Sequence, residues 1–245
     1  MRTRRDTARG EGRSALRVTL SPSLFALLLL GLAAPVAAQQ VAPLRFGVAW
    51  ARGAPRGEFA QVARAPEGFV AWLSLPITRE SPIGLRAEFS VLTVPEELVT
   101  LPVTGGGELD VTARGTVGFT GAGPRLELGS GGLALGVAVM AGYVRMITDA
   151  TARVVRDELT TSSAASDSDY ALAAKLSGDL HLPVYRGVRG TALALTAGAD
   201  YLAAGAAAFP RRDAFRVGDT GALELERPLV RPSMLVVRAG VSVEF

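Results

Sequence analysis

The sequence contains no cysteine, a single histidine and no run of about 20 apolar residues. The absence of cysteine excludes disulfide scaffolds and cysteine-based zinc sites. The absence of long apolar runs excludes a polytopic helical membrane protein, because each membrane-spanning helix needs such a run. Charged residues make up only 20% of the 245 residues, whereas hydrophobic residues make up 49%. This balance excludes a disordered chain, which is poor in apolar residues.

The basic residues are concentrated at the N-terminus. Residues 1–38 contain six arginines and two acidic residues. An apolar run over 24–32 is followed by small residues that end at Ala38, an order typical of a cleaved secretory signal peptide. We therefore expect cleavage after Ala38. Residues 39–245 retain 20 basic and 21 acidic residues, so the net charge of +3 falls to −1 and nucleic-acid binding is not predicted.

From residue 44 onward, apolar residues occupy alternate positions, which is typical of β-strands. This alternation predicts eight strands, over 44–52, 68–77, 83–94, 109–128, 133–147, 169–182, 191–203 and 233–245. In the fourth strand, residues 121–124 read Gly-Ala-Gly-Pro, and the apolar positions change there from odd to even numbers. We therefore expect a bulge or bend at residues 121–124.

The connections between these strands alternate in length. The short ones are 78–82, 129–132 and 183–190, and the long ones are 53–67, 95–108, 148–168 and 204–232. Short periplasmic turns and long extracellular loops are typical of outer-membrane barrels. The predicted fold class is all-β, an eight-stranded antiparallel up-and-down transmembrane β-barrel. We expect the apolar face of each strand to contact lipid, because the other face carries small residues that suit a narrow interior.

Aromatic residues lie near the ends of the predicted strands. Those toward the long loops are Trp50, Tyr143, Tyr170 and Tyr201, and those toward the short turns are Phe46 and Phe245. This placement predicts an aromatic girdle at the surface of a membrane.

The last predicted strand ends in Phe245, with Val243 and Val241 at the preceding alternate positions. This ending resembles the terminal assembly signal of bacterial outer-membrane barrels. With the signal peptide and the alternating strands, the whole of 39–245 resembles the small eight-stranded outer-membrane barrels, of the kind that includes the OmpA transmembrane domain and OmpX. The resemblance implies an outer-membrane location in a Gram-negative-type cell, contact with lipid and lipopolysaccharide, and help from the barrel-assembly machinery. We expect a monomer.

The charged residues on the predicted inner faces have both signs. The predicted lumen network consists of Arg45, Arg86, Glu88, Arg114, Lys175, Asp179, Asp200, Arg238 and Glu244, and Asp110 and His181 share those faces. We expect these charges to be paired, because an unpaired charge is costly in a low-dielectric interior. Arg45 is expected to meet Glu244 across the closing seam. Glu88 and Arg114 are expected at the same depth, and Lys175 near Asp200 or Asp179.

Ser177, Asp179 and His181 share one strand face, so a Ser-His-Asp set is formally available. Residues two apart on a strand are about 7 Å apart, which is too far for a hydrogen-bonded relay. We therefore predict no catalytic site. With one histidine and no cysteine, we predict no metal site and no cofactor either.

The sequence thus predicts a non-enzymatic outer-membrane barrel with a side-chain-filled lumen. Eight strands leave too little interior space for a general porin. The expected role is surface interaction or envelope integrity, carried by the long loops. One alternative is a narrow channel or carrier for ions or small apolar solutes. The other is a lipid-modifying barrel enzyme.

Overall fold

The computed structural model describes residues 44–78, 81–102, 108–130, 132–156, 159–187, 190–209, 215–217, 223–225 and 228–245. The predicted signal peptide, 1–38, lies outside these residues. None of the helices in the described ranges is long and apolar enough to span a membrane.

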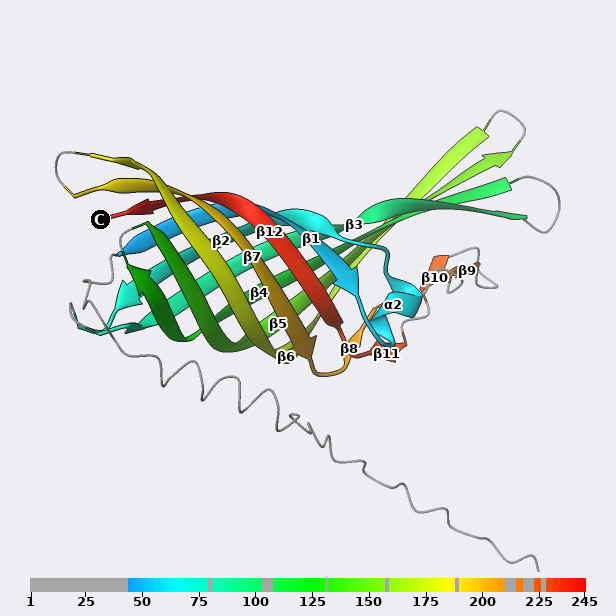
Figure 1. The fold of residues 1–245 in the computed structure, drawn as a ribbon. Coiled ribbons are helices and arrows are strands. Elements are labelled where there is room, and N and C mark those ends of the chain that lie inside the picture. Colours follow the sequence, from blue (N-terminus) through cyan, green and yellow to red (C-terminus); the bar gives the residue numbers. More distant parts are fainter. Residues whose placement is uncertain are drawn as a thin grey trace, which may run out of the picture. The chain divides into compact units, whose positions relative to one another are not determined.

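Eight strands form a closed antiparallel barrel in the order β1-β12-β7-β6-β5-β4-β3-β2 (Figure 1). Their bounds are β1 Arg45–Pro55, β2 Glu67–Pro76, β3 Ile83–Pro102, β4 Glu108–Ser130, β5 Leu133–Arg156, β6 Leu159–Arg186, β7 Ala192–Ala204 and β12 Ser233–Glu244. The predicted all-β, eight-stranded antiparallel up-and-down barrel is confirmed.

The described parts of the connections contain five small elements. The helix α2 (Phe59–Val62) follows β1. Two short antiparallel pairs lie between β7 and β12. One joins β8 (Ala207–Ala208) to β11 (Leu229–Val230), and the other joins β9 (Phe215–Val217) to β10 (Leu223–Leu225).

Both ends of the described chain lie at one end of the barrel, which we call the terminal end. The backbone N–H of Phe245 donates to the carbonyl of Leu44 at 2.9 Å. The strand ends that flank the short connections, at Pro76 and Ile83, Ser130 and Leu133, and Arg186 and Ala192, are at this end. The elements α2, β8 and β11 are at the opposite end, which we call the loop end (Figure 1).

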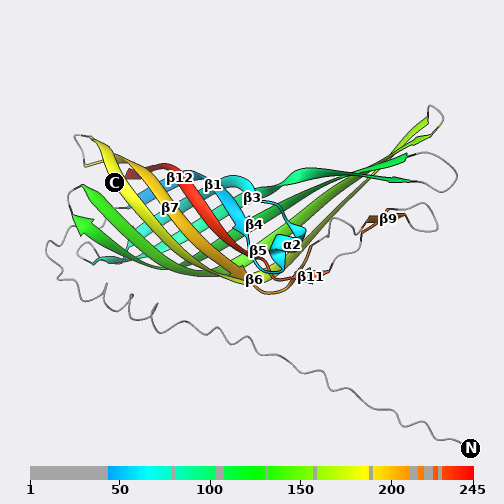
Figure 2. The ribbon, with the colours of Figure 1, turned by 45° about the vertical axis from the view of Figure 1, so that its right-hand side comes forward.

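Three strands, β3, β5 and β6, are much longer than the sequence pattern predicts. In the described residues, much of the predicted loops 95–108 and 148–168 is paired strand, with Glu97 opposite Ala113 and Thr151 opposite Ala164. The pairing of β2 with β3 ends at Thr93, and that of β7 with β6 begins at Ala173. Strands β3 to β6 therefore continue beyond the closed barrel as a four-stranded sheet (Figure 2). The sequence pattern predicts loops here because these residues are polar, but polar residues also pair in an antiparallel sheet that contacts water.

The predicted orientation of the side chains is confirmed for seven strands and is wrong for β4. In β1, for example, the odd-numbered residues from Arg45 to Gly53 are buried and the even-numbered ones from Phe46 to Ala54 are exposed. In β4, Val117 and Phe119 are buried inside the barrel. Arg114, which was predicted to face inward, is exposed.

The predicted bulge at residues 121–124 is also wrong. Ala122 lies opposite Ala141 and Arg125 lies opposite Ala138, so the pairing of β4 with β5 keeps one register across this segment. The register shift between β3 and β4 lies instead between Val94 and Glu97. The apolar residues change from odd to even positions because the interior itself changes from apolar to charged along β4.

A glycine in β1 makes room for the largest buried side chain. A Cβ at Gly47 would lie 2.2 Å from Cζ2 of Trp72, whose ring is almost completely buried. The indole therefore lies against the backbone of β1, and no other residue fits at position 47 without displacing it.

We predict that Gly47→Val lowers the free energy of unfolding by about 1–3 kcal/mol, the usual cost of overpacking a filled interior. Urea unfolding of the protein in detergent micelles measures this loss. Gly132→Val is the matched control, because a Cβ there meets nothing within 4 Å. Equal stabilities of the two variants would contradict the tight fit of Trp72.

Candidate functional site: the filled lumen

The terminal half of the lumen contains a set of buried charged side chains, which we call the charged network. Its cations are Arg45, Arg86, Arg125, Lys175 and Arg238, and its anions are Glu88, Glu127, Asp179, Asp200 and Glu244. The most accessible of these side chains, Glu127, is only 17% exposed. Five cations thus face five anions, so the network is neutral when His181 is neutral.

Asp179 on β6 lies at the centre of this network. Its Oδ1 accepts hydrogen bonds from Arg86 at 2.6 Å and from Arg238 at 3.1 Å. Its Oδ2 accepts from Arg125 at 3.0 Å and also contacts Nε2 of His181. Three strands besides β6 therefore converge on one carboxylate, and the geometry explains how this charge is tolerated inside the barrel.

A second centre lies on the loop side of Asp179. Nζ of Lys175 lies 2.9 Å from Oδ2 of Asp200 and also forms an ion pair with Glu88. Asp200 accepts further hydrogen bonds from Ser177 at 2.6 Å and from Arg238 at 3.1 Å. Of the two partners expected for Lys175, the structure shows Asp200.

A third group lies at the terminal end. Nε of Arg45 donates to Glu244 at 2.8 Å, across the seam between β1 and β12. The other two nitrogens of Arg45 donate to the two carboxylate oxygens of Glu127 at 3.1 and 3.0 Å. Arg125 connects this group to Asp179, because it lies 3.3 Å from Glu127.

Aromatic rings lie beside three cations of the charged network. The guanidinium groups of Arg86 and Arg238 each lie 5.0 Å from the centre of the Trp72 ring, and Nζ of Lys175 lies 5.3 Å from that of Phe119. Such contacts stabilise cations that are removed from water. The contact of Trp72 with two arginines was not predicted.

The structure brings together eight of the nine predicted network residues and separates the ninth. Arg114 lies opposite Asp149 on the sheet beyond the barrel, and Glu88 lies opposite Gly121. Asp110 lies beyond the barrel as well, where it accepts a hydrogen bond from Thr100.

Arg125 and Glu127 complete the network and were missed. The available signal was the outward position of Leu126 and Leu128, which requires that residues 125 and 127 face inward. That signal was obscured by the expected bulge at 121–124.

The expected separation of residues two apart on β6 is wrong for His181 and Asp179, which are in contact, but the geometry does not form a Ser-His-Asp relay. The hydroxyl of Ser177 donates to Asp200 and accepts from Arg238, while His181 contacts Asp179, Arg125 and, at 3.5 Å, Ser242. All three residues are almost fully buried. Within the described residues, no group of three or more His, Asp or Glu side chains is arranged to hold a metal ion.

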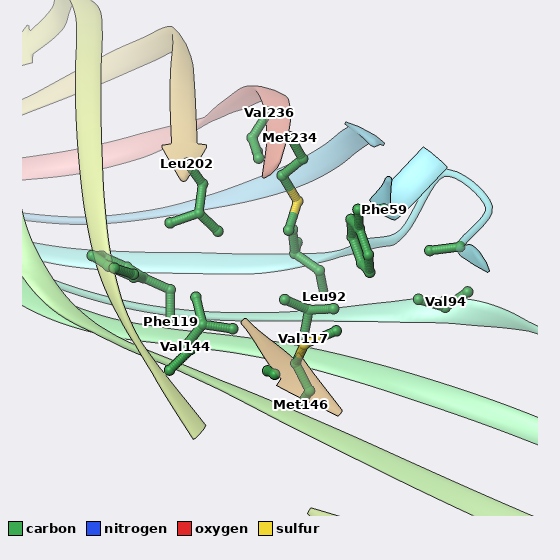
Figure 3. Close-up of a cluster of buried hydrophobic side chains, with 14 of the residues drawn as sticks. Phe59, Leu92, Val94, Val117, Phe119, Val144, Met146, Leu202, Met234 and Val236 are labelled. Atoms are coloured by element: carbon green, nitrogen blue, oxygen red, sulfur yellow. The ribbon is translucent and has the colours of Figure 1, made fainter. Parts of the chain in front are cut away.

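The loop half of the lumen contains apolar side chains instead of charges (Figure 3). We call the following residues the apolar plug: Phe59, Leu92, Val117, Phe119, Met140, Val144, Met146, Leu202, Phe209, Met234 and Val236. Phe59 of α2 and Phe209 come from the connections and pack edge to face, with ring centres 5.6 Å apart. The plug therefore joins the wall of the barrel to its loops.

The outer surface carries an apolar belt. We define this belt by the outward-facing positions in 46–50, 69–75, 85–91, 122–128, 135–143, 170–184, 193–201 and 235–243. None of these outward positions is charged. Many of the side chains are large and exposed, with Leu172 at 85%. The predicted girdle residues Trp50, Tyr143, Tyr170 and Tyr201 are exposed toward the loop end of the belt, and Phe245 is exposed at its terminal end.

Neither a protein-family model nor a curated protein matches the sequence. Several solved structures are similar in fold. The attachment invasion locus protein Ail of Yersinia pestis is 11% identical, with a TM-score of 0.41 over 82% of this chain and 99% of that one. Neisserial surface protein A is 10% identical, with a TM-score of 0.37 over 84% and 99%. A major outer membrane protein from Thermus thermophilus is 14% identical, with a TM-score of 0.41 over 83% and 100%. At these low identities and TM-scores, the similarities assign no function to the chain.

We predict that Asp179→Asn lowers the free energy of unfolding by about 3–5 kcal/mol, because it leaves buried arginines without their shared partner. Urea unfolding in detergent micelles measures the loss. The control is Glu67→Gln, which removes an exposed ion pair with Arg52 at 3.3 Å and is expected to cost at most about 1 kcal/mol. Equal losses in the two variants would show that Asp179 does not hold the network together.

Proposed function

We propose that the chain is a non-enzymatic barrel of the bacterial outer membrane, with a closed lumen, that acts through its loop end in surface interaction or envelope integrity. The observation that carries this proposal is the apolar belt. A soluble barrel exposes charges on its outer wall, whereas this barrel exposes apolar side chains there and buries charged ones in its lumen. An apolar surface of this extent requires a lipid or protein partner.

The closed sheet fits the same environment. A bilayer offers no hydrogen-bonding partner to the backbone, and only helices and closed barrels satisfy their own backbone groups. The pairing of β1 with β12 removes the free edges along the barrel. Aromatic residues at the limits of the belt are also typical of barrels that span a membrane. We propose outer-membrane lipid and lipopolysaccharide as the surroundings of this belt.

The filled lumen supports a role without transport. The charged network occupies the terminal half, and the apolar plug closes the loop half. A solute that enters at the terminal end meets paired charges first and then a layer of apolar side chains, which is unfavourable for ions. This arrangement argues against the alternative of a narrow ion channel.

The sheet beyond the barrel supports a role at the cell surface. Strands β3 to β6 extend past the belt, and their outward residues there include Arg114, Asp149 and Ser166. These polar side chains suit contact with water and with other molecules at the surface. The hydroxyl of Ser177 is fully engaged inside the network, which argues against the alternative of a lipid-modifying enzyme.

We predict that the protein inserts stably into lipid vesicles and migrates faster in an unboiled sample on a detergent gel than in a boiled one. Insertion is expected because the apolar belt then contacts lipid chains instead of water. The migration is expected to differ because the closed barrel resists unfolding by detergent. Quenching of Trp50 fluorescence by lipids with brominated chains locates the belt in the bilayer. Identical migration, together with recovery in the soluble fraction, would contradict the proposal.

We predict no stepwise conductance in planar bilayers, because the apolar plug closes the lumen. Two variants test where any current passes. Phe119→Ala opens the plug and is expected to raise any conductance through the lumen. Phe89→Ala removes the same side chain from the outer wall and is expected to change nothing. A stable current in the unmodified protein that increases only in Phe119→Ala would favour the channel.

A further inference from the structure

One position on the outer surface marks the limit of the apolar belt. On β5, the outward side chains are apolar from Leu135 to Tyr143, and the next one is Arg145. On the neighbouring strand β6, the outward side chains change from Tyr170 to Ser168 at the same place, since Tyr170 lies opposite Arg145. Arg145 is therefore the first charged side chain on the loop side of the belt along β5.

Arg145 and two tyrosines form a cluster on this surface. The guanidinium of Arg145 lies 5.4 Å from the centre of the Tyr170 ring. The rings of Tyr170 and Tyr143 are 6.2 Å apart, and both are about half exposed. On the other side of Arg145, the facing residue of β4 is Gly118, which has no side chain to cover the guanidinium. Arg145 therefore contacts the Tyr170 ring toward β6 and faces a residue without a side chain on β4.

Arg145 forms no ion pair with any of the described residues. The nearest carboxylate along its own face of β5 belongs to Asp149, which accepts a hydrogen bond from Ser166 at 2.6 Å and lies opposite Arg114. The carboxylate of Asp169 on β6 accepts the backbone N–H groups of Ala208 and Tyr170 at 2.7 and 2.8 Å. The acidic groups around Arg145 already have other partners.

A second arginine, at the equivalent place on β1, has an ion-pair partner. Arg52 lies two residues beyond the girdle residue Trp50, just as Arg145 lies two residues beyond Tyr143. Arg52, however, forms an ion pair with Glu67 at 3.3 Å. Two arginines therefore follow girdle aromatics on the outer surface, and only Arg145 has a charge that no described residue neutralises.

We propose that Arg145, with Tyr143 and Tyr170, binds the phosphate group of a membrane lipid at the loop-side limit of the apolar belt. The proposal rests on the proposed membrane location. At such a limit the lipid head groups begin, so an exposed guanidinium there meets phosphate at high local concentration. Arginine binds phosphate with two parallel hydrogen bonds, and the Tyr170 ring keeps the guanidinium at the surface. Gly118 leaves its open side free for the head group.

The test uses protein extracted from membranes into micelles that contain phosphatidylcholine and phosphatidic acid, the latter as a phosphate monoester probe. Native mass spectrometry then measures how much phosphatidic acid stays bound. We expect Arg145→Gln to weaken its apparent affinity about fivefold, the contribution of one arginine near an anionic lipid surface. Arg52→Gln is the matched control and is expected to change the affinity less than about twofold, because Glu67 already neutralises that charge.

Two further measurements separate the sources of phosphate and the role of the ring. Inorganic phosphate is expected not to displace the lipid, and displacement at equal concentration would overturn the assignment to a lipid head group. Tyr170→Phe is expected to retain binding, because it keeps the ring, whereas Tyr170→Leu is expected to weaken it. High salt should reduce the difference between the unmodified protein and Arg145→Gln, because it screens exposed charges.

The outcomes distinguish this inference from the proposed function. Trp50 quenching by brominated lipids is measured for every variant. If all variants insert and Arg145→Gln binds phosphatidic acid as well as the unmodified protein or Arg52→Gln does, the lipid site is wrong and the membrane barrel stands. If the unmodified protein does not insert, both proposals are wrong.

Discussion

Closure of the sheet is the constraint on which the rest of the structure depends. β1 pairs with β12 from Arg45–Glu244 to Pro55–Met234, so no strand has a free edge along the barrel. Every strand then has one face toward an enclosed space that is only wide enough for side chains. Each polar group on an inward face has to find its partner among the other inward groups. The pairing of five cations with five anions follows from this enclosure.

The lumen has a charged half and an apolar half because buried ions are most stable when opposite charges are grouped together. Asp179 contacts Arg86, Arg125 and Arg238 at once, and each of these arginines has a second polar partner. Spreading the same charges along the whole lumen would leave each with fewer partners, at a cost of several kcal/mol per buried ion. Lys175 lies at the boundary between the two halves, with carboxylates around its ammonium group and the Phe119 ring beside it. Beyond Phe119, the described interior is filled mainly by apolar side chains.

The sequence predicted the strands because the alternation of apolar residues follows from the two faces of a sheet. It placed seven strands with the correct face inward, and it placed Arg45, Asp179 and Arg238 in the interior. It failed for Arg114 because it assigned the apolar face of every strand to lipid, whereas apolar residues at odd positions of β4, such as Val117 and Phe119, are buried. It also ended β3 and β5 too early, because alternation disappears once both faces of a strand are in water. The convergence of distant strands on Asp179 depends on shear and tilt, which no local pattern contains.

The reversed face of β4 connects the interior to the outer surface. Val117 and Phe119 point into the plug, so the outward positions of β4 at this depth hold only Thr116, Gly118 and Thr120. A Cβ at Gly118 would meet its nearest atom at 3.6 Å, so packing does not require glycine there. The large side chains of this part of β4, Val117 and Phe119, therefore fill the lumen and do not lie beside Arg145 on the outer surface. The same strand therefore seals the barrel and leaves one face of the Arg145 guanidinium uncovered at the limit of the belt.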